Sequence, residues 1–330
     1  MSAPLVWVVG AGGMLGSAVC RELGSDAWRP ERGFTWQDSA RVGQELKEAV
    51  GAFAASVSAR AGSAWAVAWC AGAGVVGTSA AALESETKVF QLFLGLLAAE
   101  PSLASARGFV LLASSAGGVY GGTPVCPITE ATPPEPISPY GRAKLLQEQL
   151  LVSWAESQPR PVATLVARLS NLYGPAQRLD KPQGLISHIS RCAIHKAPVH
   201  VYVSLDTIRD YLFSEDAGRR IVSGLHRLVR ESAVEALHVT KVYGSEREIS
   251  IAGLLGVFRQ ITRRGVRVVS GLSSVGALQP RRLQFRSRIW TEDAGGQVEL
   301  VEGISRVYRH QLASFGQGRL PPPHVARSGR

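Results

Sequence analysis

An apolar run followed at once by closely spaced glycines opens the chain. Leu5–Val9 is apolar throughout, as expected for a strand that is buried on both faces of a parallel sheet. Glycines stand at positions 10, 13 and 16, and Ser17–Leu23 then has a helical pattern. Glycines between a strand and a helix permit a tight turn and close approach of the backbone to a pyrophosphate. The chain is therefore predicted to be an α/β protein with a Rossmann-type, doubly wound parallel sheet that binds a dinucleotide.

This glycine-rich turn supplies the first candidates for cofactor binding. They are Gly10, Gly12, Gly13, Met14, Leu15 and Gly16. An acid about 20 residues past the first glycine holds the ribose 2′-hydroxyl of NAD, whereas an arginine nearby accommodates the 2′-phosphate of NADP. Glu31 has the spacing for NAD, while Arg29 and Arg32 suit NADP. The expected cofactor is therefore NAD or NADP.

Two more strands are predicted before residue 70. Phe34–Asp38 has the pattern of a short third strand, and Trp65–Trp69 that of a fourth. The fourth strand leads into the small residues Cys70, Ala71, Gly72 and Ala73. These would let the backbone pass beneath a nicotinamide ribose, although they also suit an ordinary turn from strand to loop.

A buried strand and a helix frame the residues that can do chemistry. Phe109–Leu112 is short and apolar enough for a buried strand. Ser138 can cap a helix on which Tyr140 and Lys144, four residues apart, share one face. A nearby ammonium favours the phenolate and lowers the pKa of a phenol from about 10. Tyr140 is therefore a candidate for exchanging a proton with a substrate hydroxyl.

Four stretches carry a resemblance to a known family. They are Ser114–Gly121 after a strand, Ser138–Lys144 at the start of a helix, Arg168–Pro175 and Arg209–Asp216. Together they resemble the extended short-chain dehydrogenase/reductase family, the NAD-dependent sugar-nucleotide epimerases and dehydratases. The resemblance runs through most of the chain and thins from Val239 onward.

The resemblance implies catalytic roles for a few residues. Tyr140 would be the catalytic base, and Lys144 would lower its pKa, with both side chains in contact with the cofactor. Relatives place Ser or Thr four residues before the Tyr of Val-Tyr-Gly to orient the reacting oxygen, but this chain has Ala116 there. Ser115 is the nearest substitute and Ser114 the second.

The resemblance also implies contacts with the substrate and with the adenine of the cofactor. The implied substrate contacts are Ser115, Gly117, Tyr140, Asn171, Gln183, Arg209, Arg281 and Arg282. Arg209 is expected to bind a diphosphate, and its alternative is a surface ion pair with Asp210 or Asp216. Asp38 resembles the acid that contacts adenine, or it only caps the helix Ala40–Val50.

The composition fits a protein with two lobes. The chain has 330 residues, of which 45% are hydrophobic and 19% charged, so it can bury a large core. We expect an NAD(P)-binding domain over residues 1–180 and a substrate-binding lobe over 181–330. Part of 199–245 is expected to return to the first domain, and 316–330 to form a mobile tail.

Charge and helix patterns bear on possible partners. The net charge of +10 comes without a helix-turn-helix or an aromatic-interleaved basic motif, so nucleic acid is not an expected partner. The arginines between positions 259 and 288 form either a solvated surface or one that attracts a nucleotide diphosphate. Glu84–Glu100 and Leu145–Trp154 resemble the helices through which the family dimerises, although either could be internal core. A nucleotide sugar and a second copy of the chain are the expected partners.

Apolar stretches and cysteines bear on location. No apolar stretch is long enough to span a bilayer, so we expect no membrane association. Strand-like residues begin at Leu5, which leaves no room for a signal peptide. The four cysteines show neither disulfide nor zinc spacing. The cytoplasm is the expected location, and no metal is expected.

These features favour an enzyme, an NAD(P)-dependent nucleotide-sugar 4-epimerase that acts by transient oxidation at C4. The Ala116–Gly118 turn has no carboxyl group, which argues against the dehydration route of the 4,6-dehydratases. The first alternative is an NADPH-dependent 4-ketoreductase of a nucleotide-linked deoxysugar. A lesser alternative, from a different class, is a non-catalytic nucleotide-sensing protein.

Overall fold

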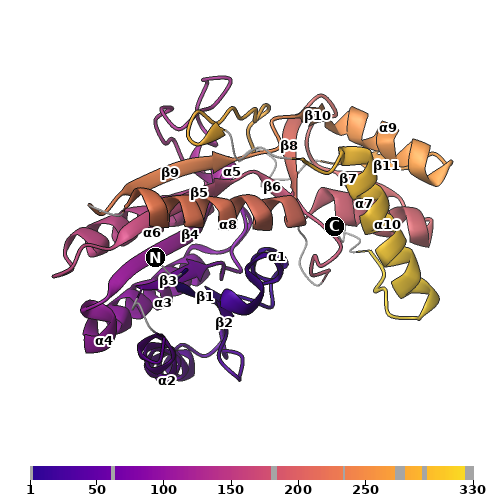
Figure 1. The fold of residues 1–330 in the computed structure, drawn as a ribbon. Coiled ribbons are helices and arrows are strands. Elements are labelled where there is room, and N and C mark those ends of the chain that lie inside the picture. The colour runs from indigo at the N-terminus through magenta and orange to yellow at the C-terminus, as the bar shows by residue number, and fades with distance from the viewer. Residues whose placement is uncertain are drawn as a thin grey trace.

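The computed structural model describes residues 3–60, 64–179, 184–232, 235–271, 279–291 and 296–323. Its centre is a six-stranded sheet in the order β2-β1-β3-β4-β5-β9, in which every pair of neighbours is parallel. The strands are β1 Leu5–Val9, β2 Ala27–Trp28, β3 Ala64–Trp69, β4 Arg107–Ser115, β5 Ala163–Leu169 and β9 His238–Tyr243. The α/β, Rossmann-type fold class is confirmed (Figure 1).

Helices cover both faces of this sheet (Figure 1). One face packs on α2 Ser39–Ser58, α3 Ala80–Ala99, α4 Pro101–Ala104 and α6 Pro139–Glu156. The other packs on α1 Met14–Leu23 and α8 Ser214–Glu231. Buried strands with apolar side chains on both faces require this arrangement. The short helices η1 Gly24–Asp26 and α5 Ala116–Val119 follow α1 and β4.

The strand order places a binding crevice. The chain moves outward from β1 to β2 and then returns to β3 on the other side of β1. Ligands of doubly wound sheets bind outside the carboxyl ends of the strands at such a reversal. The glycine-rich turn after β1 and the small residues after β3 both lie at that edge.

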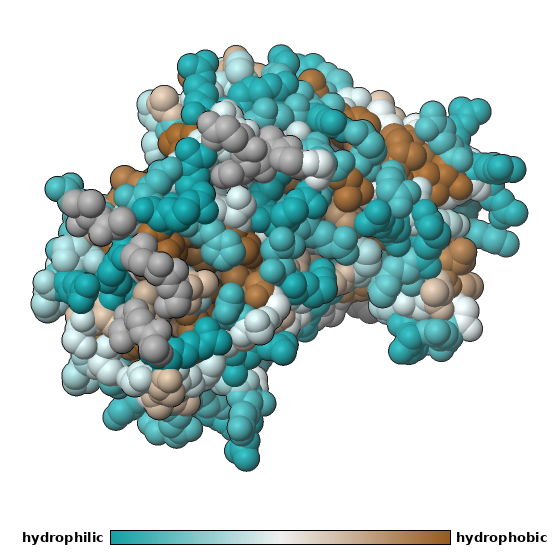
Figure 2. Space-filling view, in the orientation of Figure 1, coloured by the Kyte–Doolittle hydropathy of each residue, from teal (hydrophilic) through white to brown (hydrophobic). Residues whose placement is uncertain are grey.

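A second, smaller group of elements lies beyond this edge. A three-stranded sheet has the order β10-β8-β6, from Glu248–Ser250, Ile208–Phe213 and Asn171–Tyr173. A two-stranded parallel sheet joins β7 Val199–Val201 to β11 Val268–Ser270. The helices are α7 Leu185–His195, α9 Ile251–Thr262 and α10 Leu300–Gly316, which share one apolar core with these strands. Much of the face in Figure 2 is hydrophilic, with hydrophobic residues gathered near α9.

The prediction of a strand at Phe34–Asp38 is wrong, because these residues form a coil and a turn. The backbone N–H and the hydroxyl of Thr35 both donate to the Glu45 carboxylate, at 2.6 and 2.9 Å. Phe34 packs on Trp7, with 6.5 Å between ring centroids. The Glu45 side chain thus accepts from the Thr35 backbone N–H that a neighbouring strand would otherwise need. The strand β2 forms earlier in the chain.

No helix in the described ranges is long and apolar enough to cross a membrane.

Candidate active site

The glycine-rich turn has the shape that a dinucleotide requires. Gly10 has a φ of 86°, in the left-handed region that favours glycine, and its carbonyl accepts from the N–H of Gly13 at 2.9 Å. A Cβ on Gly10 would lie 2.6 Å from the Ala71 nitrogen, so the turn packs directly on the segment after β3. Gly13 caps α1 without a side-chain hydrogen bond, and no acid stands in the first helical turn. The N-terminal N–H groups of α1, at Met14 and Leu15, therefore suit a pyrophosphate.

Gly16 gives a direct test of this turn. A Cβ on Gly16 would lie 2.2 Å from the Gly10 oxygen, whereas a Cβ on Gly12 would meet nothing within 4 Å. Gly16→Ala should therefore lower the free energy of unfolding by about 1–3 kcal/mol, because the turn has to move. The same substitution should weaken NAD binding. Gly12→Ala is the matched control for stability. The measurements are urea unfolding and calorimetric NAD titration, and equal stability of the two variants would contradict the account.

The candidates for the adenosine end of the cofactor lie after β2. Arg29, Glu31 and Arg32 are all exposed there. One Asp38 carboxylate oxygen accepts from the N–H of Ala40 at 3.1 Å and of Arg41 at 3.0 Å. Asp38 therefore caps α2, the second of the two roles considered for it.

Tyr140 stands at the start of α6 and faces the turn after β4. The Ser138 hydroxyl accepts from the N–H of Gly141 at 3.0 Å and caps this helix. A Cβ on Gly118 would lie 3.1 Å from two carbons of the Tyr140 ring, and a Cβ on Gly141 2.1 Å from the Gly118 oxygen. Glycines on both segments therefore allow the close contact. The phenol is half-buried, and the Lys144 nitrogen lies 6.0 Å from the centre of its ring.

The Lys144 ammonium is buried and held by two oxygens. It lies 3.4 Å from Glu86 Oε1 and 3.0 Å from Gln147 Oε1. Both partners were missed by reasoning from the sequence. Gln147 follows Lys144 by less than one helical turn and could have been considered, whereas Glu86 comes from α3, 58 residues earlier, with no motif to mark it.

The two serines after β4 have different surroundings. Ser115 caps α5, and its oxygen accepts from the N–H of Gly118 at 3.1 Å. Ser114 is buried and donates to Glu148 Oε1 at 2.5 Å, so its hydroxyl is already hydrogen-bonded beneath the turn. Ala116 is fully buried. Ser115, half-buried, is the better placed of the two to meet a substrate.

Glu148 belongs to a buried ion pair that supports this turn. Its carboxylate accepts from Arg168 Nη2 at 2.6 Å, and Arg168 Nη1 donates to the Tyr120 hydroxyl at 2.5 Å. Burial lowers the pKa of the Arg168 guanidinium, but the hydrogen bond and the charge of Glu148 raise it by more than that. The pKa of Arg168 therefore lies above its usual value. Burial raises the pKa of Tyr120, which therefore stays neutral. Sequence reasoning did not find this pair.

Arg209 and Asn171 lie on neighbouring strands, β8 and β6, with Asn171 opposite Tyr211. The Asn171 amide donates to the Asp210 carbonyl at 2.9 Å. Arg209 is buried, and its guanidinium donates to the Ile208 carbonyl at 2.8 Å and to the Gln279 side chain at 3.3 Å. Burial lowers the pKa of Arg209. Gln183, a third predicted substrate contact, lies outside the described residues.

The acids suggested as ion-pair partners of Arg209 are engaged elsewhere. The Asp210 carboxylate accepts from the N–H of Ser245 at 2.8 Å and from its hydroxyl at 3.0 Å. Burial raises the pKa of Asp210, although these hydrogen bonds oppose the shift. Asp216 pairs with Arg219 at 2.7 Å.

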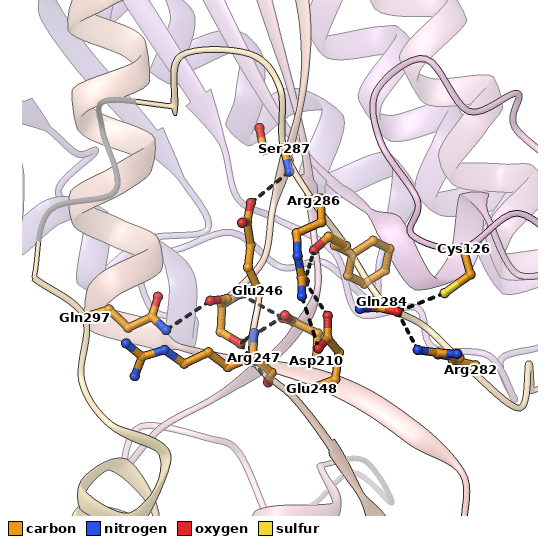
Figure 3. A network of polar contacts seen from close by, with 12 residues as sticks. Cys126, Asp210, Glu246, Arg247, Glu248, Arg282, Gln284, Arg286, Ser287 and Gln297 are labelled. Atoms are coloured by element: carbon orange, nitrogen blue, oxygen red, sulfur yellow. Dashed lines mark hydrogen bonds and ion pairs between the residues drawn. The ribbon is translucent and has the colours of Figure 1, made fainter.

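Residues 281–288 form a strap across the turn after β4. The strap pairs with Ile208 of β8 and with Ile128, through hydrogen bonds of 2.8–3.2 Å. Its Leu283 side chain would lie 3.3 Å from a Cβ on Gly117, so Gly117 leaves room for the strap. In Figure 3, Arg282 donates to the Gln284 side chain at 2.7 Å, and Cys126 contacts the same oxygen. Arg281 forms an exposed ion pair with Asp206.

Comparison with known proteins finds similar sequences. A model of the NAD-dependent epimerase/dehydratase family matches residues 6–234. The dTDP-L-rhamnose 4-epimerase of Burkholderia thailandensis is 35% identical over 99 residues, which is 30% of this chain and 27% of that protein. The dTDP-glucose 4,6-dehydratase of Neisseria gonorrhoeae is 36% identical over 106 residues, which is 32% of this chain and 28% of that protein. These matches therefore span less than a third of either relative.

A solved structure shows the same fold over nearly the whole chain. The UDP-glucose 4-epimerase of Thermotoga maritima superposes with a TM-score of 0.72 at 19% identity, covering 94% of this chain and 99% of that one. The family match covers more than half of the chain and includes the glycine-rich turn, Tyr140 and Lys144. By that match and by this fold, the chain belongs to the NAD-dependent epimerase/dehydratase family.

Proposed function

We propose that this protein is a nucleotide-sugar 4-epimerase that uses NAD. The observation that carries the proposal is the placement of Tyr140 and Lys144 on one face of α6, beside the loop after β3. That edge of the sheet is where a dinucleotide binds in this fold. The turn from Ala116 to Gly118 has no carboxyl group, which favours epimerisation over elimination of water.

The residues divide the proposed chemistry among them. Bound NAD supplies the hydride acceptor and donor at C4. Tyr140, as phenolate, takes the proton of the C4 hydroxyl, and Lys144 stabilises the phenolate by its positive charge. The Ser115 hydroxyl orients the reacting oxygen. Tyr140 later returns the proton to the oxygen of the turned sugar as C4 regains a hydride, and this return of the hydride leaves the reaction with no net redox change.

The substrate lobe would hold the rest of the nucleotide sugar. Arg209 presents a guanidinium that is not paired with Asp210 or Asp216, and guanidinium binds phosphate oxygens in a bidentate manner. Arg281 and Arg282 lie on the adjoining strap. Asn171 lies on the neighbouring strand opposite Tyr211, two residues along from Arg209, where it can contact the sugar.

The test is turnover of a panel of UDP- and dTDP-linked hexoses by the purified protein with NAD, followed by proton NMR. Conversion of one member into its C4 epimer, without net consumption of NAD, supports the proposal. Failure to interconvert any member of the panel would contradict it.

A 4-ketoreductase that uses NADPH is the second candidate. It is favoured by the buried Ala116, which stands where relatives carry a hydroxyl, and by the exposed Arg29 and Arg32. Mass spectrometry of the copurified cofactor separates the two. Tightly held NAD supports the epimerase, whereas an empty site that binds NADPH with micromolar affinity supports the reductase.

A homodimer through α3 and α6 completes the proposal. The two helices border a groove of about 500 Å³. Leu146 on α6 lines this groove and is 47% exposed, and large exposed apolar side chains favour association. The native protein should have twice the chain mass by light scattering, and Leu146→Glu should be monomeric. Leu312→Glu, on an equally exposed leucine of α10, is the matched control, and a monomeric native protein would contradict the prediction.

The four cysteines bear on where the protein works. All four are free thiols, at positions 20, 70, 126 and 192. Free thiols persist in reducing compartments. They support the cytoplasm as the proposed location.

A further inference from the structure

Glu86 is a half-buried acid on α3 to which no role has been assigned. Its Oε2 accepts from the N–H of Ala73 at 2.9 Å and of Gly74 at 3.0 Å. Hydrogen bonds to an ionised acceptor are stronger than those between neutral groups. Glu86 therefore connects the loop after β3 to helix α3 by hydrogen bonds. This loop borders the predicted cofactor crevice.

The other oxygen of the same carboxylate faces Lys144. Oε1 lies 3.4 Å from the Lys144 nitrogen, and the Glu86 and Lys144 side chains are 19% and 7% exposed. The ammonium also donates to Gln147, which in turn donates to Thr87 on α3 at 3.2 Å. A buried ammonium needs partners of this kind. Glu86 therefore holds the Lys144 ammonium in position directly, and Thr87, also on α3, does so through Gln147.

The glycines of the loop show how closely these groups meet. A Cβ on Gly72 would lie 3.1 Å from Glu86 Oε1 and 3.4 Å from the Lys144 nitrogen. A Cβ on Gly74 would lie 3.4 Å from the Tyr140 ring and 3.5 Å from Glu86 Oε2. The carboxylate therefore lies against the loop and the ammonium, and Gly74 of the loop lies close to both the carboxylate and the Tyr140 ring.

We propose that Glu86 is a positioning residue of this site, which joins the loop at Ala73–Gly74 to the Lys144 ammonium and so places that ammonium relative to Tyr140. The inference rests on the proposed function in one respect, that Tyr140 is the base. The carboxylate also has an electrostatic effect, because its charge offsets part of the positive field that favours the phenolate.

Other charged groups on α3 and α6, the helices that carry Glu86 and Lys144, have their own partners. These are Glu148 with Arg168, Glu84 with Lys88, and Arg142 with the Ile137 carbonyl. The buried Tyr120 is bonded to Arg168. Within the described ranges, Glu86 is the carboxylate in ion-pair contact with Lys144.

The test measures the ionisation of Tyr140 in the full chain saturated with NAD. Phenolate absorbance is followed against pH, and the same titration of each protein carrying Tyr140→Phe is subtracted to isolate this phenol. In Glu86→Gln, which keeps the size of the side chain and removes its charge, the midpoint should fall by about 0.5–1 pH unit. Glu84→Gln removes the same charge two residues away, from an exposed pair with Lys88, and should leave the midpoint unchanged.

A second readout concerns the loop. Glu86→Ala removes the acceptor of both loop amides and should weaken NAD binding about tenfold by calorimetry, with Glu84→Ala as control. An unchanged or higher Tyr140 midpoint in Glu86→Gln would overturn the proposal, even if Glu86→Ala fails to fold. Neither readout uses a sugar nucleotide, so an outcome here is distinct from failure of the epimerase assay.

Discussion

Replacing Tyr140 by Phe should lower kcat for sugar interconversion by about a thousandfold, because a positioned acid–base group typically contributes between about 10² and 10⁴ in rate. The substitution removes one oxygen and keeps the ring that packs on Gly118. NAD affinity and thermal stability should therefore stay close to those of the native protein. The effect should appear in kcat, with little change in KM.

Tyr202→Phe is the matched control for this loss. Tyr202 is a partly exposed tyrosine whose ring stacks on His200, outside the site. Its loss of a hydroxyl should leave turnover unchanged. Full activity of Tyr140→Phe on every substrate tested would instead support the non-catalytic, nucleotide-sensing alternative.

Glu148→Ala should be the most destabilising of these substitutions, by about 3–5 kcal/mol, because it leaves the Arg168 guanidinium buried without its carboxylate. The Arg168 and Glu148 side chains are only 8% and 6% exposed. The same substitution frees the Ser114 hydroxyl beneath the turn after β4. Urea unfolding measures the loss.

Two further variants test whether the uncompensated charge of Arg168 causes the loss of stability in Glu148→Ala. Glu84→Ala breaks an exposed pair with Lys88 and should leave stability close to that of the native protein. Glu148→Leu combined with Arg168→Met replaces both partners by apolar side chains and should recover much of the stability lost in Glu148→Ala. A double variant less stable than Glu148→Ala would contradict this explanation.

Much of the central sheet could be predicted from the sequence, because its strands are apolar runs next to glycines or small residues. Leu5–Val9 and the strand containing Trp65–Trp69 lie where they were predicted. The helix capped by Ser138 is also confirmed. Phe34–Asp38 failed because a strand pattern carries no information on a distant acid, here Glu45, that takes its backbone donor.

The candidate site was predictable only where neighbours in space are also neighbours in sequence. Tyr140 and Lys144 share a helical face, so their spacing alone places them together. Glu86 and the strap reach the site from distant parts of the chain, and only the tertiary fold brings them there. The buried Ser114 is another example, since the sequence does not distinguish a hydroxyl that faces a substrate from one that faces Glu148.

A crystal structure of the full chain with NAD and a nucleotide sugar would show whether Tyr140 is the proton-exchanging group beside the dinucleotide. The Tyr140 hydroxyl should lie within about 2.6–3.2 Å of the sugar hydroxyl oxygen that loses its proton. A complex in which the Tyr140 hydroxyl faces solvent, with the sugar and the nicotinamide bound elsewhere, would contradict it.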